Sequence, residues 1–323
     1  MFGKIIGTGS YIPDNRVTND DLSQIMDTSD EWISERTGIR ARHIIDEETT
    51  ADLAVNAAKH AIESAGVDPL EIDMILVSTV SSNLVLPNTA CFVQQEIGAE
   101  NATCFDINTA CTGFMVAYNT VQAYINAGVI ETALIVAAEG LSKIMDWSDR
   151  GTCILFGDGA GAAVVRRDEK AVFETVMYSD GNGKDALYMD NSFAGRTNPF
   201  ASDQKKIEEH VLMDGAGVFR FAVDKVPKAI KALLEKINMD ANDIDCYVLH
   251  QANKRILKSI SKRLKVSEEK IPTNLEEYGN TSSACIPILL DELVREGKVK
   301  AGDKLLMSGF GAGLTWAATY LEF

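Results

Sequence analysis

Three side chains that could cooperate in covalent catalysis are the thiol of Cys111, the imidazole of His250 and the carboxamide of Asn280. Cys111 lies in the segment 107–128, "INTACTGFMVAYNTVQAYINAG", where an apolar strand pattern changes to a helix pattern. A thiol at a helix N-terminus is close to free backbone N–H groups and to the positive end of the helix dipole, and both favour the thiolate. Cys111 is therefore a candidate nucleophile; the alternative is a small side chain that fills a crowded junction.

The other two side chains supply groups that a thiol nucleophile can use. His250 ends an apolar run, "CYVLH", and precedes a polar helix start, "QANKR". Asn280 lies in the segment "YGNTSSA", where it could also serve only as a helix N-cap. Together, the thiol could attack, the imidazole could exchange a proton or form a hydrogen bond, and the carboxamide could act as a neutral donor.

Glycine-rich turns at two places have different interpretations. The segment 308–316, "SGFGAGLTW", follows an apolar strand pattern, and glycine there lets backbone amides approach a ligand closely enough to form an oxyanion hole. A tight turn required only for packing is the alternative. The segment 157–162, "GDGAGA", fits the dinucleotide-binding pattern GxGxxA but precedes "AVVRR" and not a helix pattern, so we reject nucleotide binding there.

Two regions of the chain align with two later ones in the order of their elements, which indicates an internal duplication. The aligned pairs are 61–78 with 233–250, at an offset of 172 residues, and 110–128 with 279–297, at an offset of 169. The first alignment places Ser78 opposite His250, and the second places Cys111 opposite Asn280. If both halves present equivalent loops to a shared cleft, the three candidate side chains become neighbours.

The duplication also predicts the fold class. Near-continuous apolar runs at 132–140 and 303–311 are typical of strands covered on both faces, so we expect them to be corresponding central strands. We therefore predict an α/β protein with a layered αβαβα arrangement and pseudo-twofold symmetry. Residues 1–171 would form the half with the cysteine, residues 172–323 the half with the histidine and the asparagine, and the join would lie near 168–175.

Composition excludes several classes of function. The formal net charge of −16 argues against general binding to nucleic acid or to an anionic membrane. The N-terminus lacks the pattern of a signal peptide, and no apolar run approaches the roughly 20 residues that cross a bilayer, so we expect a cytoplasmic protein. The six cysteines are scattered without a CxxC pair, which disfavours disulfide and zinc frameworks. Most of them are expected to be inert core residues, and nothing suggests a metal or redox cofactor.

Seven motifs, correctly ordered along essentially the whole chain, resemble those of the β-ketoacyl-[acyl-carrier-protein] synthase III family. The motifs are "GTGSYIPDNRVTNDDL", "TSDEWISERTGIRARH", "DINTACTGF", "DRGTCILFGDGAGAAV", "LHQANKRI", "YGNTSSA" and "GFGAGLTW". The resemblance implies a thiolase-like fold of two duplicated halves with a catalytic triad of Cys111, His250 and Asn280. It also implies an oxyanion hole formed by the backbone N–H groups of Cys111 and Ala312, where a residue other than glycine departs from the family pattern.

The activity that the resemblance implies is the initiating condensation of bacterial type II fatty-acid synthesis. Cys111 would take the acyl group of a short acyl-CoA, and malonyl-acyl carrier protein would then lose carbon dioxide and attack the acyl-cysteine. Trp32, Arg36 and Arg150 would bind coenzyme A around its adenine. Without the resemblance, Trp32 would be a half-buried surface residue and Arg36 a solvated charge. The resemblance implies no cofactor; acyl-CoA and malonyl-acyl carrier protein are the two substrates.

A basic segment stands out against the acidic composition. The segment 254–265, "KRILKSISKRLK", has six Lys or Arg residues and no acid, and its apolar residues are spaced as the buried stripe of a helix. A solvated helix face is the alternative to a binding surface. Because acyl carrier proteins are strongly acidic, we expect a docking surface for one here. The docking residues would be Arg220, Lys254, Arg255, Lys262 and Arg263.

A loop at 82–90 bears on the acyl substrate. In the family the matching loop crosses a homodimer interface, and its tip residue, commonly aromatic, bounds the partner's acyl pocket. Leu86 occupies that position here. A smaller and more flexible side chain changes the pocket depth, so we expect primers other than acetyl to be accepted by a homodimer.

Related activities remain as alternatives. A degradative thiolase would need a second catalytic cysteine in the segment "SGFGAG", which has none, and a 3-hydroxy-3-methylglutaryl-CoA synthase would add a glutamate. A plant-type polyketide synthase is generally longer, whereas a starter synthase of specialised metabolism is the closest competitor. A cysteine peptidase does not explain the duplicated halves. A non-catalytic carrier-protein-binding module does not explain the intact set of Cys111, His250 and Asn280.

Overall fold

The computed structural model describes residues 1–196, 200 and 206–323. The first half of the chain contains β1 (Phe2–Tyr11), α3 (Thr50–Ala65), β4 (Met74–Ser78), α4 (Thr89–Ile97), β5 (Thr103–Ile107), α5 (Gly113–Asn126), β6 (Thr132–Glu139) and β7 (Gly159–Asp168). The strands form a five-stranded sheet in the order β1, β7, β6, β4, β5. Strand β4 is parallel to β5 and β6, whereas β7 is antiparallel to β1 and β6.

The second half repeats this plan. It contains β8 (Phe173–Ser179), α6 (Gly215–Lys236), β11 (Cys246–Leu249), α7 (Lys254–Leu264), α9 (Cys285–Arg295), β12 (Lys304–Gly311) and β13 (Thr315–Glu322). Its sheet has the order β8, β13, β12, β11, which matches β1, β7, β6, β4 of the first sheet. Among the described residues no strand lies beyond β11, so the counterpart of β5 is missing.

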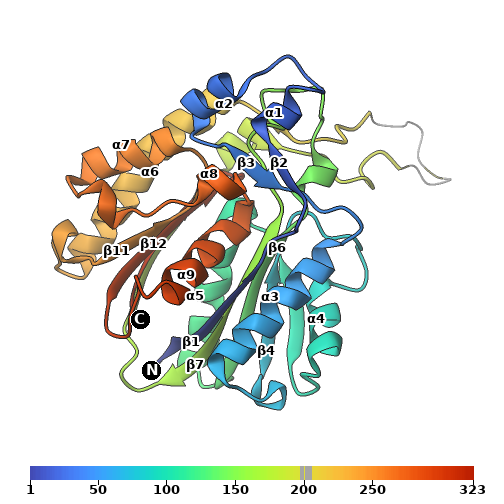
Figure 1. Cartoon of the computed structure of the whole chain (residues 1–323). Helices are drawn as coiled ribbons and strands as arrows, with labels where there is room; N and C mark the ends of the chain where they lie inside the picture. The colour runs from blue at the N-terminus through green and yellow to red at the C-terminus, as the bar shows by residue number, and fades with distance from the viewer. Residues whose placement is uncertain (197–199, 201–205) are drawn as a thin grey trace.

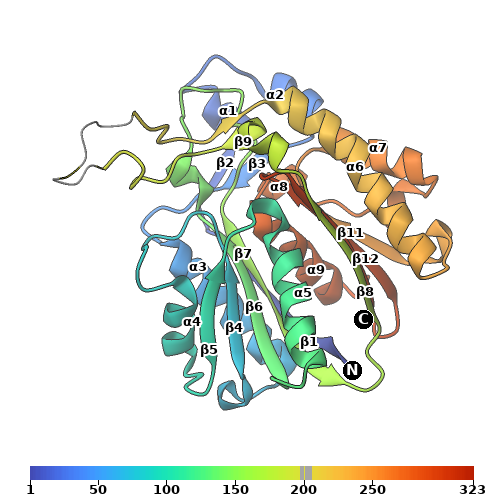
Figure 2. The same ribbon diagram turned by 180° about the vertical axis from the view of Figure 1, so that it is seen from behind.

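Five layers follow from the way the sheets bury their apolar faces (Figures 1 and 2). Helices α3 and α4 pack on the outer face of the larger sheet, and α6 and α7 pack on the outer face of the smaller one. Helices α5 and α9 lie between the sheets, where Leu76 and Val248 belong to the same core. The predicted α/β fold with thiolase-like αβαβα layers is confirmed.

Local sequence explains where these elements begin and end. The central strands β6 and β12 carry mostly apolar residues because both of their faces are covered. Helix α3 begins with a capping box, in which Thr49 and Asp52 each accept a hydrogen bond from the other's backbone N–H. It ends at Gly66, whose φ of 62° closes the helix in the left-handed region.

A single offset of 172 residues relates the two halves from η1 to β6. It connects the 3₁₀ turns η1 (Pro69–Glu71) and η5 (Ala241–Asp243), the strands β4 and β11, the turns η2 (Ala110–Thr112) and η7 (Ser282–Ala284), the helices α5 and α9, and the strands β6 and β12. The predicted offset of 169 for the second aligned region is therefore wrong. Small residues around both turns fit several registers equally well, and the turn geometry selects one. Cys111 corresponds to Ser283, and Asn280 corresponds to Asn108.

Short elements cover the end of the sheets where β4, β6, β11 and β12 finish. They are β2 (Arg16–Thr18), α1 (Asn19–Leu22), α2 (Asp30–Thr37), β3 (Ala41–His43), η3 (Leu141–Ile144), η4 (Gly181–Ala186), β9 (Leu187–Tyr188), β10 (Leu212–Met213) and α8 (Leu275–Tyr278). The turn η6 (Glu268–Lys270) lies near the start of β11 instead, where the Lys270 Nζ atom donates to the carbonyls of Asn242 and Ile244. Figure 1 shows α1, α2 and α8 at this end, opposite the two termini. No helix in the described part of the chain is long and apolar enough to span a bilayer.

Two sequence predictions concern the region between the halves. Strand β7 begins directly after the segment 157–158, so a strand and not a helix follows the start of the glycine-rich motif, as its sequence context predicted. The chain passes from the first sheet to the second between Asp168 and Phe173. The exact division at residues 171 and 172 stays a prediction.

Candidate active site

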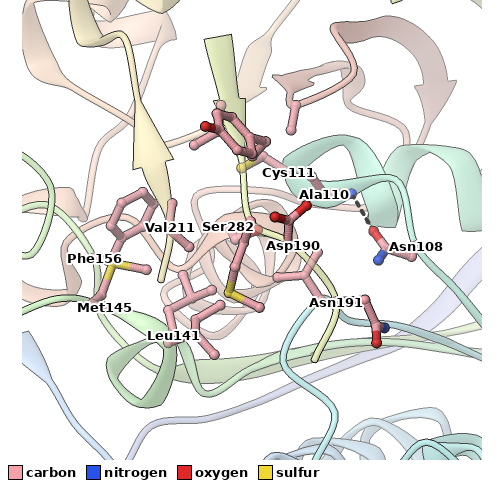
Figure 3. A pocket seen from close by; sticks show the side chains of 16 residues that line it. Asn108, Ala110, Cys111, Leu141, Met145, Phe156, Asp190, Asn191, Val211 and Ser282 are labelled. Carbon is pink, nitrogen blue, oxygen red and sulfur yellow. Dashed lines mark hydrogen bonds between the residues drawn. The ribbon is translucent and has the colours of Figure 1, made fainter. Parts of the chain in front are cut away.

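Cys111 lies in turn η2, directly before α5, and is 6% exposed. The turn begins at Ala110, whose φ of 47° is rare for a residue with a side chain. The Asn108 Oδ1 atom accepts a hydrogen bond from the Ala110 N–H at 3.3 Å (Figure 3). The predicted position of the thiol at a strand-to-helix junction is confirmed.

Asn280 occupies the corresponding place in the second half. Its Oδ1 atom accepts a hydrogen bond from the Ser282 N–H at 2.9 Å, and Ser282 has a φ of 51°, close to that of Ala110. Backbone hydrogen bonds to Leu155 and Gly157 fix the Asn280 main chain. Because Oδ1 is used in this way, the amide is oriented, and its Nδ2 group has no hydrogen-bond partner among the described residues. Nδ2 is therefore available to a ligand.

The two turns are exchanged between the halves. Turn η2 of the first half packs against β12, turn η7 of the second half packs against β6, and the turns contact each other. Gly311 at the end of β12 approaches Cys111 so closely that a Cβ atom there would lie 2.8 Å from the Cys111 backbone nitrogen. Such a contact is too short, so glycine is required at position 311. The sequence predicted that this glycine-rich segment lies close to a ligand. The structure shows that Gly311 lies close to the backbone of Cys111 itself.

Two cavities meet at Cys111. The first, of about 330 Å³, has an apolar wall that includes Leu141, Met145 and Phe156 (Figure 3), and Ala312 also lines it. The second, of about 530 Å³, is lined by Cys111, His250 and Asn280 and continues outward to the surface helices. The structure therefore brings together the three candidate catalytic side chains, which come from two sheets.

His250 follows β11 and is held on several sides. Its backbone N–H donates to the Ser308 carbonyl at 2.9 Å, and its ring stands edge-on to Phe310, with centroids 4.9 Å apart. The Nδ1 atom lies 2.7 Å from the Cys285 Sγ atom. Burial lowers the pKa of His250 to about 3, because a charged imidazolium would lose its hydration. The ring is neutral at physiological pH.

The protonation state of Cys111 differs from the sequence-based expectation. Burial raises the pKa of the Cys111 thiol to about 12, and the nearby Glu139 carboxyl raises it further, whereas a hydrogen bond with Ser282 lowers it. The predicted preference for a resting thiolate is therefore wrong, because desolvation outweighs the favourable helix end. The thiol must lose its proton as it reacts.

Two groups near the site were missed by sequence reasoning. Glu139 is fully buried and accepts hydrogen bonds from the Val80 N–H, the Ser81 hydroxyl and the Ser283 hydroxyl. Burial raises the pKa of this carboxyl. A charged residue at the end of the apolar run "ALIVAAE" was the available signal. Cys285 was grouped with inert core cysteines, and nothing in its sequence context indicated the contact with His250.

The three residues predicted to bind coenzyme A lie together. Trp32 and Arg36 line the second cavity, and the Arg36 guanidinium carbon is 4.4 Å from the centre of the Trp32 ring. Arg150 also faces this ring, with its guanidinium carbon 5.0 Å from the ring centre, and it contacts Asp27. An aromatic ring flanked by two guanidinium groups offers a stacking site for a flat base.

The residues predicted to dock the carrier protein differ in position and in what they contact. Arg220 and Arg255 line the second cavity. Lys254 forms an ion pair with Glu276 that uses its charge within the chain. Lys262 and Arg263 are exposed near the other end of α7, about 12 Å along the helix from Arg255 at 1.5 Å per residue. The apolar residues Ile256, Ile260 and Leu264 are buried, so the predicted amphipathic helix is confirmed.

Leu86 does not line either cavity of the single chain. It is 84% exposed, and Leu84 and Val85 beside it are also exposed. The loop lies between β4 and α4, and strand β5 at the nearby edge of the five-stranded sheet pairs only with β4 among the described residues. This apolar loop and open strand edge lie on one side of the molecule (Figure 2). In the described part of the chain no three His, Cys, Asp or Glu side chains are grouped to hold a metal ion.

Comparison with known proteins identifies the family. Residues 105–181 match the family described as 3-oxoacyl-[acyl-carrier-protein (ACP)] synthase III, and residues 234–323 match its C-terminal part. The β-ketoacyl-[acyl-carrier-protein] synthase III of Clostridium acetobutylicum is 48% identical over 99% of this chain and 98% of its own length. The crystal structure of 3-oxoacyl-[acyl-carrier-protein] synthase III from Aquifex aeolicus VF5 has a TM-score of 0.93 and 41% identity, covering 99% of this chain and 100% of that one.

A related solved structure extends the same fold to another pathway. The priming β-ketosynthase of the R1128 polyketide biosynthetic pathway has a TM-score of 0.92 and 38% identity, covering 100% of this chain and 96% of that one. The architecture is thus that of the thiolase-fold condensing enzymes. Within that class, the chain belongs to the β-ketoacyl-[acyl-carrier-protein] synthase III family, and the resemblance stated from the motifs is confirmed.

Proposed function

We propose that this chain joins a short acyl-CoA to malonyl-acyl carrier protein by decarboxylative condensation, through an acyl group carried on Cys111. This is the initiating step of type II fatty-acid synthesis. The observation that carries the proposal is the position of Cys111 at the meeting point of two cavities, the second of which it shares with His250 and Asn280. One cavity can hold an acyl chain while the other admits a thioester to the sulfur.

In the first half-reaction the Cys111 sulfur attacks the acyl-CoA carbonyl. The carbon–sulfur bond to coenzyme A breaks, and the departing thiolate takes up the proton that the Cys111 thiol gives up. The backbone N–H groups of Cys111 and Ala312 stabilise the oxyanion that forms between these events. The close approach of Gly311 to Cys111 supports this assignment, because it brings the two backbone segments together.

In the second half-reaction the carrier-protein thioester occupies the cavity next to His250 and Asn280. Hydrogen bonds from His250 and from the free Asn280 Nδ2 group hold the thioester oxygen while the malonyl group loses carbon dioxide. The electron pair of the broken bond forms a carbon–carbon bond with the acyl-cysteine carbonyl. The Cys111 thiolate leaves and takes a proton from solvent, and a 3-ketoacyl-carrier protein is released. Both substrates are activated thioesters, so the reaction needs no cofactor.

Surface features support the proposed substrates and partner. Coenzyme A would place its adenine against Trp32, in place of one of the guanidinium groups that face the ring. The acyl carrier protein would dock on Arg220 and Arg255, with Lys262 and Arg263 extending the basic surface and Lys254 holding the helix to Glu276. Charge complementarity with an acidic carrier favours association.

A homodimer and a cytoplasmic location complete the proposal. The exposed loop residues Leu84, Val85 and Leu86, together with the open edge of β5, would be covered by a second copy of the chain. Leu86 would then bound the partner's acyl cavity. Light scattering coupled to gel filtration tests the dimer, and cell fractionation tests the location. A monomer at all concentrations would remove the proposed role of Leu86.

Intact-mass measurement tests the function. The protein is incubated with acetyl-, isobutyryl- or octanoyl-CoA, beside a Cys111→Ala variant, before malonyl-carrier protein is added. One acyl group should attach only when Cys111 is present and should leave as a ketoacyl product after the second substrate. Acylation with the longer primers is expected because the cavity next to Cys111 has an apolar wall. A strict preference for acetyl-CoA would contradict the primer expectation, and no adduct with any thioester would contradict the function.

A further inference from the structure

The contact between His250 and Cys285 is an unusual feature of the site. The His250 Nδ1 atom lies 2.7 Å from the Cys285 Sγ atom, and each residue is 2% exposed. The same sulfur accepts a hydrogen bond from the Gln251 N–H at 3.4 Å. Cys285 is the first residue of α9 and follows turn η7, whose first residue, Ser282, lines the first cavity. The thiol therefore lies behind the imidazole, on the side away from a substrate that contacts Nε2.

The partners available to each group indicate which atom donates. Burial lowers the pKa of His250 to about 3 and raises the pKa of Cys285, so both groups are neutral at physiological pH. A neutral thiol has one proton to donate, and a neutral imidazole has one acceptor nitrogen. Among the described residues, His250 Nδ1 is the acceptor within hydrogen-bonding distance of this sulfur. The sulfur already accepts from Gln251, so its own proton satisfies both groups when it points to Nδ1.

The pseudo-twofold relation shows that packing alone does not require this pair. At the offset of 172 residues, His250 corresponds to Ser78 and Cys285 corresponds to Gly113. A Cβ atom on Gly113 would lie 1.7 Å from the Ser78 Oγ atom, so the first half leaves no room for a side chain there. The same junction carries a thiol only in the half that holds the imidazole.

We propose that Cys285 is a positioning residue, whose thiol donates to His250 Nδ1 and thereby holds the ring as the tautomer with its proton on Nε2. That proton then points into the second cavity and donates to the thioester oxygen of the malonyl substrate. The inference rests on the proposed function for its consequence, because an Nε2 donor matters to the condensation step. The tautomer itself is a property of the resting protein and can be measured without turnover.

Nitrogen-15 NMR of histidine-labelled protein tests the tautomer. The chain has four histidines, and a His250→Gln variant assigns the signals of this one. Protonated and unprotonated ring nitrogens have well-separated shifts. The wild type should show a protonated Nε2 and an Nδ1 that accepts a hydrogen bond. Cys285→Ala should move the Nδ1 signal toward that of a free acceptor, and Cys285→Ser should restore a hydrogen-bonded signal. A protonated Nδ1 in the wild type would overturn the proposal, whatever the variants do.

Steady-state kinetics test the consequence. Cys285→Ala should lower kcat for condensation roughly tenfold, the scale of one lost hydrogen bond to a positioned group, while the KM for acyl-CoA changes little. Cys285→Ser should recover most of that loss. Cys153→Ala is the matched control, because it removes another buried thiol, whose sulfur contacts Met26 and not His250.

The outcomes separate this inference from the proposed function. An unchanged kcat together with an unchanged Nδ1 signal in Cys285→Ala would overturn the positioning role. If Cys285→Ala does not fold, the wild-type spectrum and the Cys285→Ser variant still decide the tautomer. A wild type that does not condense the substrates at all would refute the proposed function and leave the tautomer measurement standing.

Discussion

The side chain of Asn280 has two separate roles, because the oxygen and the nitrogen of its carboxamide have different surroundings. Its Oδ1 atom accepts from the Ser282 N–H at 2.9 Å, whereas its Nδ2 group has no hydrogen-bond partner among the described residues, and Asn280 lines the cavity that it shares with Cys111 and His250. An Asn280→Ala substitution removes both. The loss of Oδ1 leaves a buried N–H without an acceptor, which lowers the free energy of unfolding by about 1–3 kcal/mol.

The loss of Nδ2 acts on the reaction. A donor aimed at an oxyanion contributes about 2.7–4 kcal/mol to the transition state, so condensation should fall by about a hundredfold to a thousandfold. Acylation of Cys111 by acyl-CoA should persist in Asn280→Ala, because the proposed oxyanion hole for that step uses the backbone of Cys111 and Ala312. Single-turnover intact-mass measurement follows acylation, and release of carbon dioxide follows the second step.

Asn119→Ala provides the matched control. Asn119 is 7% exposed, like the 6% of Asn280, and its Oδ1 accepts from the Thr319 hydroxyl at 3.4 Å. Urea unfolding should therefore show a loss in both variants, but only Asn280→Ala should lose condensation. An Asn280→Ala enzyme that condenses within threefold of the wild-type rate would refute the donor role. An equal loss of condensation in Asn119→Ala would assign the effect to stability.

Three further predictions concern the nucleophile and the basic surface. Gly311→Ala should lower acylation about a hundredfold by displacing Cys111, whereas Gly181→Ala, whose Cβ meets open space, should be silent in the same intact-mass assay. A raised pKa reduces the fraction of thiolate at every pH below that pKa. Because the pKa of Cys111 is about 12, the rate of its alkylation by iodoacetamide should rise about tenfold per pH unit from pH 7 to 10. A plateau of this rate near pH 9 would contradict the prediction. Arg255→Glu should raise the KM for malonyl-carrier protein about tenfold at low salt and leave the KM for acyl-CoA unchanged. Lys258→Glu on the same helix should change neither KM. Equal increases of both KM values in Arg255→Glu would refute the docking role.

The fold was predictable because its signals are long and regular. The apolar runs at 132–140 and 303–311 predicted β6 and β12 within one residue, and their equivalence indicated two similar sheets. Buried central strands are read well from sequence because both faces are covered and the run is almost continuously apolar. The junction at Cys111 was predicted for the same reason, since an apolar strand pattern gives way to a helix pattern there.

The register and the protonation states were not predictable in this way. Cys111 was aligned with Asn280 because alanine, serine and threonine fill both turns, and the positive φ of Ala110 and Ser282, with the offset of the flanking elements, shows which residues correspond. The thiolate was expected from the helix end, whereas the pKa of Cys111 depends on burial by segments distant in the sequence. The partner of His250 Nδ1 was missed because a contact across 35 residues has no local signature.

The exchange of turns η2 and η7 between the two sheets has a consequence for refolding. Neither sheet alone can hold the nucleophile against Gly311 or place His250 and Asn280 beside it, so a chain with only one ordered sheet carries a thiol without a reaction partner. Recovery of acylation after dilution from denaturant should therefore lag behind recovery of secondary structure. The time course of regained acylation then reports when the two sheets pack together. A nascent chain likewise cannot become acylated before its C-terminal residues have emerged and packed.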